Sequence, residues 1–185
     1  NQVREIDKNF ELKFDKMILI LDPFNLQVKT KIVGADIIYR DKIIKLENIK
    51  SNISIRSLLN NKFSLQNLSI STQSLQIKNL ISILRLFKNN PKIYIAERFI
   101  KEGYIIADIN IEFEDTGKIK DNFKIKGFLK DGKINFLKKN NFSNIDLIFN
   151  INKNNFNFND INFRLNKKIF YISELIWNNK DNKFY

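Results

Sequence analysis

Apolar and polar residues alternate almost without interruption from Gly103 to Leu165, and short turn signals break the alternation at intervals. Successive side chains of a β-strand point to opposite faces, so each run predicts a strand that is apolar on one side and polar on the other. The apolar positions are Ile105, Ala107, Ile109, Ile111 and Phe113; Phe123, Ile125, Gly127 and Leu129; Ile145, Leu147, Phe149 and Ile151; and Phe156, Phe158, Ile161, Phe163 and Leu165.

The chain before this stretch predicts more strands of the same kind, so that about twelve strands follow one another at the spacing of an antiparallel meander. They are expected over Asn9–Phe14, Met17–Leu21, Leu26 to Gly34, Ala35–Arg40, Lys42–Leu46, Ile49 to Ile55, Phe63 to Ile70 and Leu75 to Ile77, with another over Ile169–Trp177. Met17–Leu21 is apolar at every position, which predicts a strand that is covered on both faces or lies against a neighbouring element. The apolar parity slips near Asn48, Asn67 and Asn159-Asp160, and each slip predicts a β-bulge or bend.

One segment has helical rather than strand periodicity. Leu80, Ile83, Leu84 and Phe87 recur at helical spacing, so we expect a helix over Asn79–Lys88 that Asn79 caps and Asn89-Asn90-Pro91 ends. A further strand is expected over Lys92–Glu97, followed by an irregular connection. The dipeptide Asp131-Gly132 predicts a hairpin turn, because both residues tolerate a positive φ angle.

The composition argues against an enzyme. Histidine and cysteine are both absent, which removes the commonest general base, the commonest metal ligand and the thiolate nucleophile. We therefore expect no catalytic residues, no metal and no cofactor. The acidic residues Asp108, Glu112 and Glu114 share the polar side of one expected strand, so a solvated face explains them better than a catalytic carboxylate pair.

The net charge of +12 could attract nucleic acid or anionic lipid headgroups. Lysine, asparagine, isoleucine and phenylalanine are abundant together, however, as in proteins from genomes rich in A and T. Nucleic-acid binding also favours exposed aromatic residues, whereas most phenylalanines lie on the apolar parity, and Phe128 is the exception. We therefore expect no nucleic-acid partner.

The predicted fold class is mainly β: an elongated, strongly twisted antiparallel β-meander, open like a taco, with one short helix. Its parts are amino-terminal strands over 1–78, the helix over 79–90 and a carboxy-terminal meander over 92–185, all within a single β-rich unit. The chain begins with Asn and contains no signal sequence or long apolar run, so we expect a segment of a longer protein. A sandwich, a closed barrel and an open groove all remain compatible with the periodicity.

The first half also resembles a known family. The stretch from Leu21 to Ile77 contains "NIKSNISIRSLL", then "FSLQNLSIS" and "SLQI" before the expected helix, and the second half contains "GFLKDGKINF" followed by alternating strands. This order resembles the AsmA-like envelope proteins, which include TamB-like members and are similar in fold to chorein-type lipid-transfer proteins. The resemblance lies in pattern and layout, and covers most of the chain.

The resemblance implies a non-enzymatic lipid-binding or lipid-transfer segment, located on the periplasmic side of the inner membrane and active in outer-membrane biogenesis. Its apolar groove would carry phospholipid acyl chains towards the outer membrane. Parts of the protein outside these residues would contact the inner membrane, and contact with the outer membrane is left open. The expected groove lining is the apolar set given above from Ile105 to Phe163, without Gly127. The alternative is a structural β-sandwich interaction module of the envelope without a lipid ligand.

Overall fold

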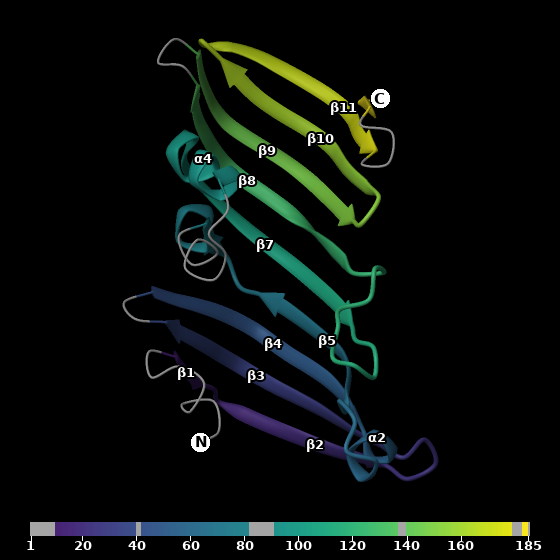
Figure 1. Cartoon of the computed structure of the whole chain (residues 1–185). Helices are drawn as coiled ribbons and strands as arrows, with labels where there is room; N and C mark the ends of the chain where they lie inside the picture. Colours follow the sequence, from purple (N-terminus) through teal and green to yellow (C-terminus); the bar gives the residue numbers. More distant parts are fainter. Residues whose placement is uncertain (1–9, 40–41, 82–90, 137–139, 179–182, 185) are drawn as a thin grey trace.

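A computed structural model describes residues 10–39, 42–81, 91–136, 140–178 and 183–184 of the chain, and most of them lie in β-strands (Figure 1). The strands are β1 (Phe10–Lys13), β2 (Lys16–Asp22), β3 (Gln27–Tyr39), β4 (Lys42–Ser54), β5 (Leu65–Thr72), β6 (Leu75–Gln76), β7 (Ile100–Glu112), β8 (Lys124–Phe136), β9 (Asn140–Asn152), β10 (Asn155–Leu165), β11 (Lys168–Asn178) and β12 (Lys183–Phe184).

All the described strands belong to one antiparallel sheet, whose main path runs β1-β3-β4-β5-β7-β8-β9-β10-β11-β12. β2 also pairs with β3, beside β1, and β6 pairs with β7. The main path follows the sequence order, because each of its strands turns back beside the previous member of the path. The sheet is open, which confirms the predicted mainly β, antiparallel fold class. It does not have the two packed sheets of a sandwich in the part of the chain described.

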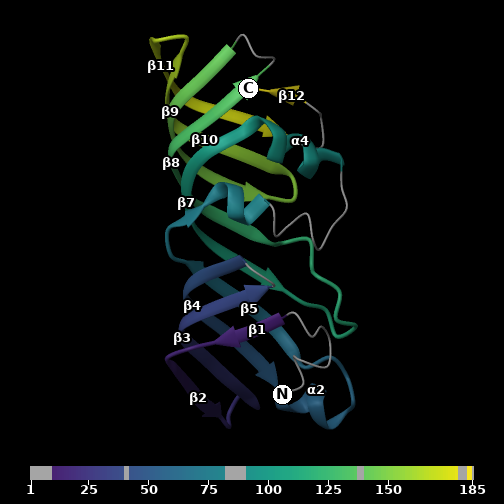
Figure 2. The ribbon, with the colours of Figure 1, turned by 90° about the vertical axis from the view of Figure 1, so that its left-hand side faces the viewer.

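The sheet is strongly curved, and α4 (Pro91–Phe99) lies on its hollow side (Figure 2). α4 contacts β7 and β8. A second short helix, α2 (Ile55–Leu59), follows β4 and begins where the Ser54 hydroxyl accepts a hydrogen bond from the Ser57 N–H at 3.1 Å. Most of the expected helix 79–90, namely residues 82–90, lies outside the described residues, and residues 77–81 are helical. Ile81 and the neighbouring Leu75 of β6 are both buried.

The three predicted parity slips are confirmed as breaks in register. The β4–β5 pairing shifts between Leu46 and Asn48. It shifts again between the pairs Asn52–Asn67 and Ile53–Leu65. The β9–β10 pairing shifts between Asn159 and Asn162. A bulge adds one residue to one strand, so side chains on the two sides of it can stay on the same face although their parity changes.

The Asp131-Gly132 prediction was wrong, because these residues lie inside the continuous strand β8. Asp131 has φ 52°, and the register of β8 shifts there against both β7 and β9. The positive φ that favours Asp-Gly in a hairpin turn is used here for a bulge. Gly34 does not end a strand either, since β3 continues through it with φ 64°.

Two further predictions need correction. Residues 92–97 form part of helix α4 rather than a strand, because Pro91, which was expected to end a helix, occupies the first helical position that proline tolerates. β2 was expected to be covered on both faces or to lie against a neighbouring element. The first alternative is wrong, since Leu19, Ile20 and Leu21 are 62%, 57% and 63% exposed.

Candidate functional site

The sixteen predicted lining residues lie on one face of the sheet, here called the inner face. In register across β7, β8 and β9, Ile105 pairs with Leu129, which pairs with Leu147. Phe113 and Phe123 flank the ends of β7 and β8. Beyond the bulges, Ile145 remains beside Gly132, and the Phe163 ring lies 5.8 Å from that of Phe142. None of the sixteen is fully exposed.

One row of inner-face side chains crosses nine strands without a polar residue. We call it the long apolar rank; directly paired positions connect Met17, Ile32, Ile49, Ile70, Ile109, Ile125, Ile151, Phe156 and Trp177. With neighbouring strands about 4.8 Å apart, its eight intervals span about 38 Å. Met17 is 47% exposed, and the other eight side chains are half-buried. The rank is therefore an extended apolar surface that the described residues cover only in part.

A parallel row on the same face is packed much more closely. This buried rank consists of Ala35, Leu46, Thr72, Ala107, Gly127 and Phe149. Ala35 is 0% exposed and Leu46 2%. The Thr72 hydroxyl accepts a hydrogen bond from the Ala107 N–H at 2.9 Å, so its polar atom is satisfied where it is buried.

Gly127 allows the side chains of the buried rank to pack closely at the centre of the sheet. A Cβ atom at this position would lie 2.1 Å from the Ile106 carbonyl oxygen and 2.8 Å from Cζ of Phe149. Only glycine leaves room for the Phe149 ring to lie against the strand, and Phe149 is 6% exposed. The glycine thus provides the close contact between β8 and β9.

Besides Thr72, two polar side chains of the inner face form a hydrogen bond with each other. Thr30 and Ser51 are directly paired across β3 and β4. Their hydroxyl oxygens lie 2.6 Å apart, and both residues are buried. Such a pair presents few free donors or acceptors to a ligand, so the inner face is chemically an apolar surface.

Charged residues lie on the opposite, outer face, where they also hold the β8 bulge. Lys130 Nζ lies 2.9 Å from Asp146 Oδ2, and Asp146 Oδ1 accepts a hydrogen bond from the Asp131 N–H at 2.8 Å. Burial raises the pKa of Asp146, but the hydrogen bonds from Lys130 and Asp131 outweigh this and hold it below its ordinary value. Asp146 therefore fixes the backbone at the point where β8 changes parity.

The expected solvated carboxylates lie on the outer face as well. Asp108 pairs with Lys126 at 3.8 Å, and both side chains are substantially exposed. Glu112 lies 3.5 Å from Lys120; hydrogen bonds from Asn122 and then Lys120 lower its pKa. Among the described residues, no group of three or more His, Cys, Asp or Glu side chains could hold a metal ion.

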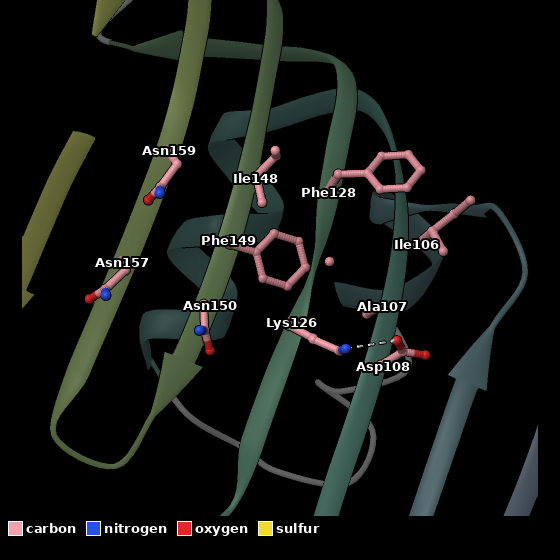
Figure 3. Close-up of a pocket in the computed structure, with 11 residues that line it drawn as sticks. Ile106, Ala107, Asp108, Lys126, Phe128, Ile148, Phe149, Asn150, Asn157 and Asn159 are labelled. Atoms are coloured by element: carbon pink, nitrogen blue, oxygen red, sulfur yellow. Dashed lines mark ion pairs between the residues drawn. The ribbon is translucent and has the colours of Figure 1, made fainter. Parts of the chain in front are cut away.

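Sequence reasoning missed a shallow hollow on the outer face (Figure 3). Ile106, Phe128 and Ile148 are in direct register on β7, β8 and β9, and Phe128 is 44% exposed and Ile148 50%. Asn150, Asn157 and Asn159 complete the rim. The available signal was Phe128 on the polar parity, but only the register shows that it has two apolar neighbours.

The fold and these faces define a class: an open antiparallel sheet whose concave face is apolar and partly covered. Comparisons with models of known families, with curated proteins and with solved structures found no match to this chain. The resemblance to AsmA-like proteins therefore stays a prediction from sequence pattern. In the described part of the chain, no helix has the length and apolar character needed to cross a membrane.

Proposed function

We propose that the chain is a non-enzymatic lipid-binding or lipid-transfer segment whose inner face holds phospholipid acyl chains. The observation that carries the proposal is the long apolar rank. Its length of about 38 Å exceeds twice the hydrocarbon thickness of one bilayer leaflet, which is about 15 Å. In most proteins, a solvent-exposed apolar surface of this extent is a ligand-binding or interaction site.

The chemistry of the inner face also favours acyl chains over polar ligands. The Thr30 and Ser51 hydroxyls are bonded to each other, and the charged side chains described above lie on the outer face. A ligand without hydrogen-bonding groups along its length loses nothing by lying on such a surface. The place proposed for this segment, on the periplasmic side of the inner membrane, rests on the resemblance to AsmA-like envelope proteins alone.

The first test is mass spectrometry of lipid extracted from the purified protein, together with transfer of a fluorescent phospholipid between vesicles. Ile109→Glu and Leu147→Glu place a charge on the inner face of β7 and β9. We expect bound phospholipid and the transfer rate to fall at least tenfold. Unfolding by these changes would instead mean that the inner face is a closed core, and the proposal would lose its basis.

The same strands offer a matched control. Ile106→Glu and Ile148→Glu make an equivalent change on the outer face, three residues from Ile109 and one from Leu147. We expect lipid binding to remain within twofold of the unchanged chain. Equal loss in both pairs of variants would show that a general change in charge, rather than the inner face, controls lipid association.

A second candidate is an interaction module of the envelope without a lipid ligand. The outer hollow around Ile106, Phe128 and Ile148 favours it, since the exposed Phe128 and Ile148 and the half-buried Ile106 lie in register and form an apolar contact surface. Under this alternative the purified chain carries no phospholipid, and Phe128→Glu rather than Ile109→Glu abolishes its binding to envelope proteins.

A further inference from the structure

β2 lies at the first edge of the described sheet. β2 pairs with β3 through a regular register from Lys16–Val33 to Asp22–Gln27, without a bulge. Among the described strands, β3 is the only one that pairs with β2. In an antiparallel ladder alternate residues direct their N–H and C=O groups away from the paired neighbour. The far side of β2 therefore presents a regular row of backbone donors and acceptors.

The side chains along this edge are apolar on both faces. Met17, Leu19 and Leu21 lie on the inner face in register with Ile32, Thr30 and Val28, and Ile18 and Ile20 lie on the outer face. Leu19, Ile20 and Leu21 are each more than half exposed. Natural edge strands usually carry a proline, a bulge or an inward charge that prevents pairing. None of these occurs between Lys16 and Asp22.

We propose that β2 is the interface of a symmetric dimer, in which it pairs antiparallel with β2 of a second copy of this chain. The argument for a second copy is charge complementarity, because the strand reads Lys-Met-Ile-Leu-Ile-Leu-Asp. With Leu19 opposite Leu19 of the second copy, Ile18 faces Ile20 and Met17 faces Leu21. Lys16 then faces Asp22 at both ends of the pairing.

The charges select this register over its neighbours. A shift by two residues would place Lys16 opposite Ile20 and Asp22 opposite Phe14. Opposite charges across a ladder stabilise it, whereas a charge set against an apolar side chain does not. Lys16 forms no ion pair among the described residues, and Asp22 is kept ionised by Asn25 and Lys29, whose hydrogen bonds lower its pKa to about 2.

The symmetry keeps the two inner faces on the same side. Antiparallel pairing of identical strands places a twofold axis between the two opposed Leu19 residues, normal to the sheet. Met17, Leu19 and Leu21 of each copy therefore meet on one face, and the two apolar inner faces become continuous. The dimer itself does not depend on lipid; only a doubled lipid path would rest on the proposed function.

The opposite edge of the sheet is a poorer interface. β11 also has exposed apolar residues, with Ile169 at 72%. Ser173 and Glu174 interrupt its apolar run, however, and the Tyr171 hydroxyl donates a hydrogen bond to Asp160 at 3.1 Å. β12 already pairs with Trp177 and Asn178 of this strand. The edge of β11 therefore provides a control for the edge of β2.

The first experiment measures self-association by sedimentation velocity over a range of concentrations. A single pair of seven-residue strands buries little area, so we expect a reversible dimer that dissociates on dilution. Lys16→Asp places two carboxylates opposite each other at both ends, and should weaken the dimer at least tenfold. Lys31→Asp makes the same charge change one strand away, opposite Ile18, and should have less than a threefold effect. A monomer at every concentration, or equal effects of the two changes, would overturn the proposal.

The second experiment uses the absence of cysteine from the chain. Leu19→Cys places one thiol of each copy beside the twofold axis, where opposed Cα atoms lie about 4.5–5.5 Å apart, within the range that a disulfide spans. Mild oxidation should give a disulfide-linked dimer that reductant reverses. Ile169→Cys, on the β11 edge, should stay monomeric under the same conditions. Cross-linking of both variants to the same extent, or of neither, would contradict the β2 interface.

Discussion

The two ranks of the inner face run side by side and are built from the same kinds of strand, yet they differ in how closely they are packed. The buried rank uses small side chains, a satisfied threonine and one glycine, and its members from Ala35 to Phe149 are mostly out of contact with solvent. The long apolar rank uses isoleucine at six consecutive strands, and its side chains remain half-buried. Close packing needs small or fitted side chains, whereas a surface that receives a ligand needs uncovered apolar area.

The two ranks should differ most in the stability that is lost when an aromatic ring is removed from each. Phe149→Ala leaves a cavity at a position that is 6% exposed, so we expect the free energy of unfolding to fall by about 3–5 kcal/mol. Phe156→Ala, on the half-buried rank, should lower it by about 1–2 kcal/mol. Urea titration of both variants measures the difference, and equal losses would mean that the two ranks are one core.

A methyl group added to the buried rank should also lower the free energy of unfolding more than a small change in the long apolar rank. Gly127→Ala forces a methyl group towards the Ile106 carbonyl oxygen and the Phe149 ring, and should lower the free energy of unfolding by about 2–3 kcal/mol. Ile125→Val, two residues along β8 on the long rank, should cost about 0.5–1 kcal/mol. Thermal unfolding followed by circular dichroism gives both values. A neutral Gly127→Ala would contradict the close contact between β8 and β9.

The hydrogen bond inside the buried rank should have a smaller effect. Thr72→Val keeps the shape of the side chain but leaves the buried Ala107 N–H without its acceptor. We expect a loss of about 1–2 kcal/mol in the free energy of unfolding, measured by urea titration. Thr72→Ser keeps the hydroxyl and should recover most of it. Equal losses for valine and serine would show that packing, not the hydrogen bond, matters at this position.

The smallest effect should be the pH dependence of the β8 bulge, which lies beyond both ranks and brings Gly132 into register with Ile145. Because the pKa of Asp146 is lowered in the folded chain, its contribution is present above its ordinary pKa near 4 and is lost as the pH falls through the folded value. Asp146→Asn should therefore reduce the difference in urea midpoint between pH 6 and pH 3. An unchanged difference would exclude Asp146 as the clamp of this bulge.

Much of this arrangement was predictable from alternation alone. The apolar parity from Ile105 to Phe163 identified one face, and the parity slips near Asn48, Asn67 and Asn159 identified three bulges. Asp131-Gly132 was misread because a positive φ at Asp-Gly serves a bulge as well as a turn, and local sequence does not distinguish them. The strand expected over Lys92–Glu97 failed because Pro91 can begin a helix as readily as end one.

The sequence by itself determined that the chain forms antiparallel strands with one apolar side, because the period of two is a property of each strand alone. Only the tertiary structure decided which apolar residues on different strands lie in the same row, since register depends on bulges and turns along the whole sheet. That register distinguishes the long apolar rank, whose side chains from Ile32 to Trp177 are half-buried, from the buried rank beside it. It also brings Ile106 and Ile148 to Phe128, and leaves β2 at an open edge.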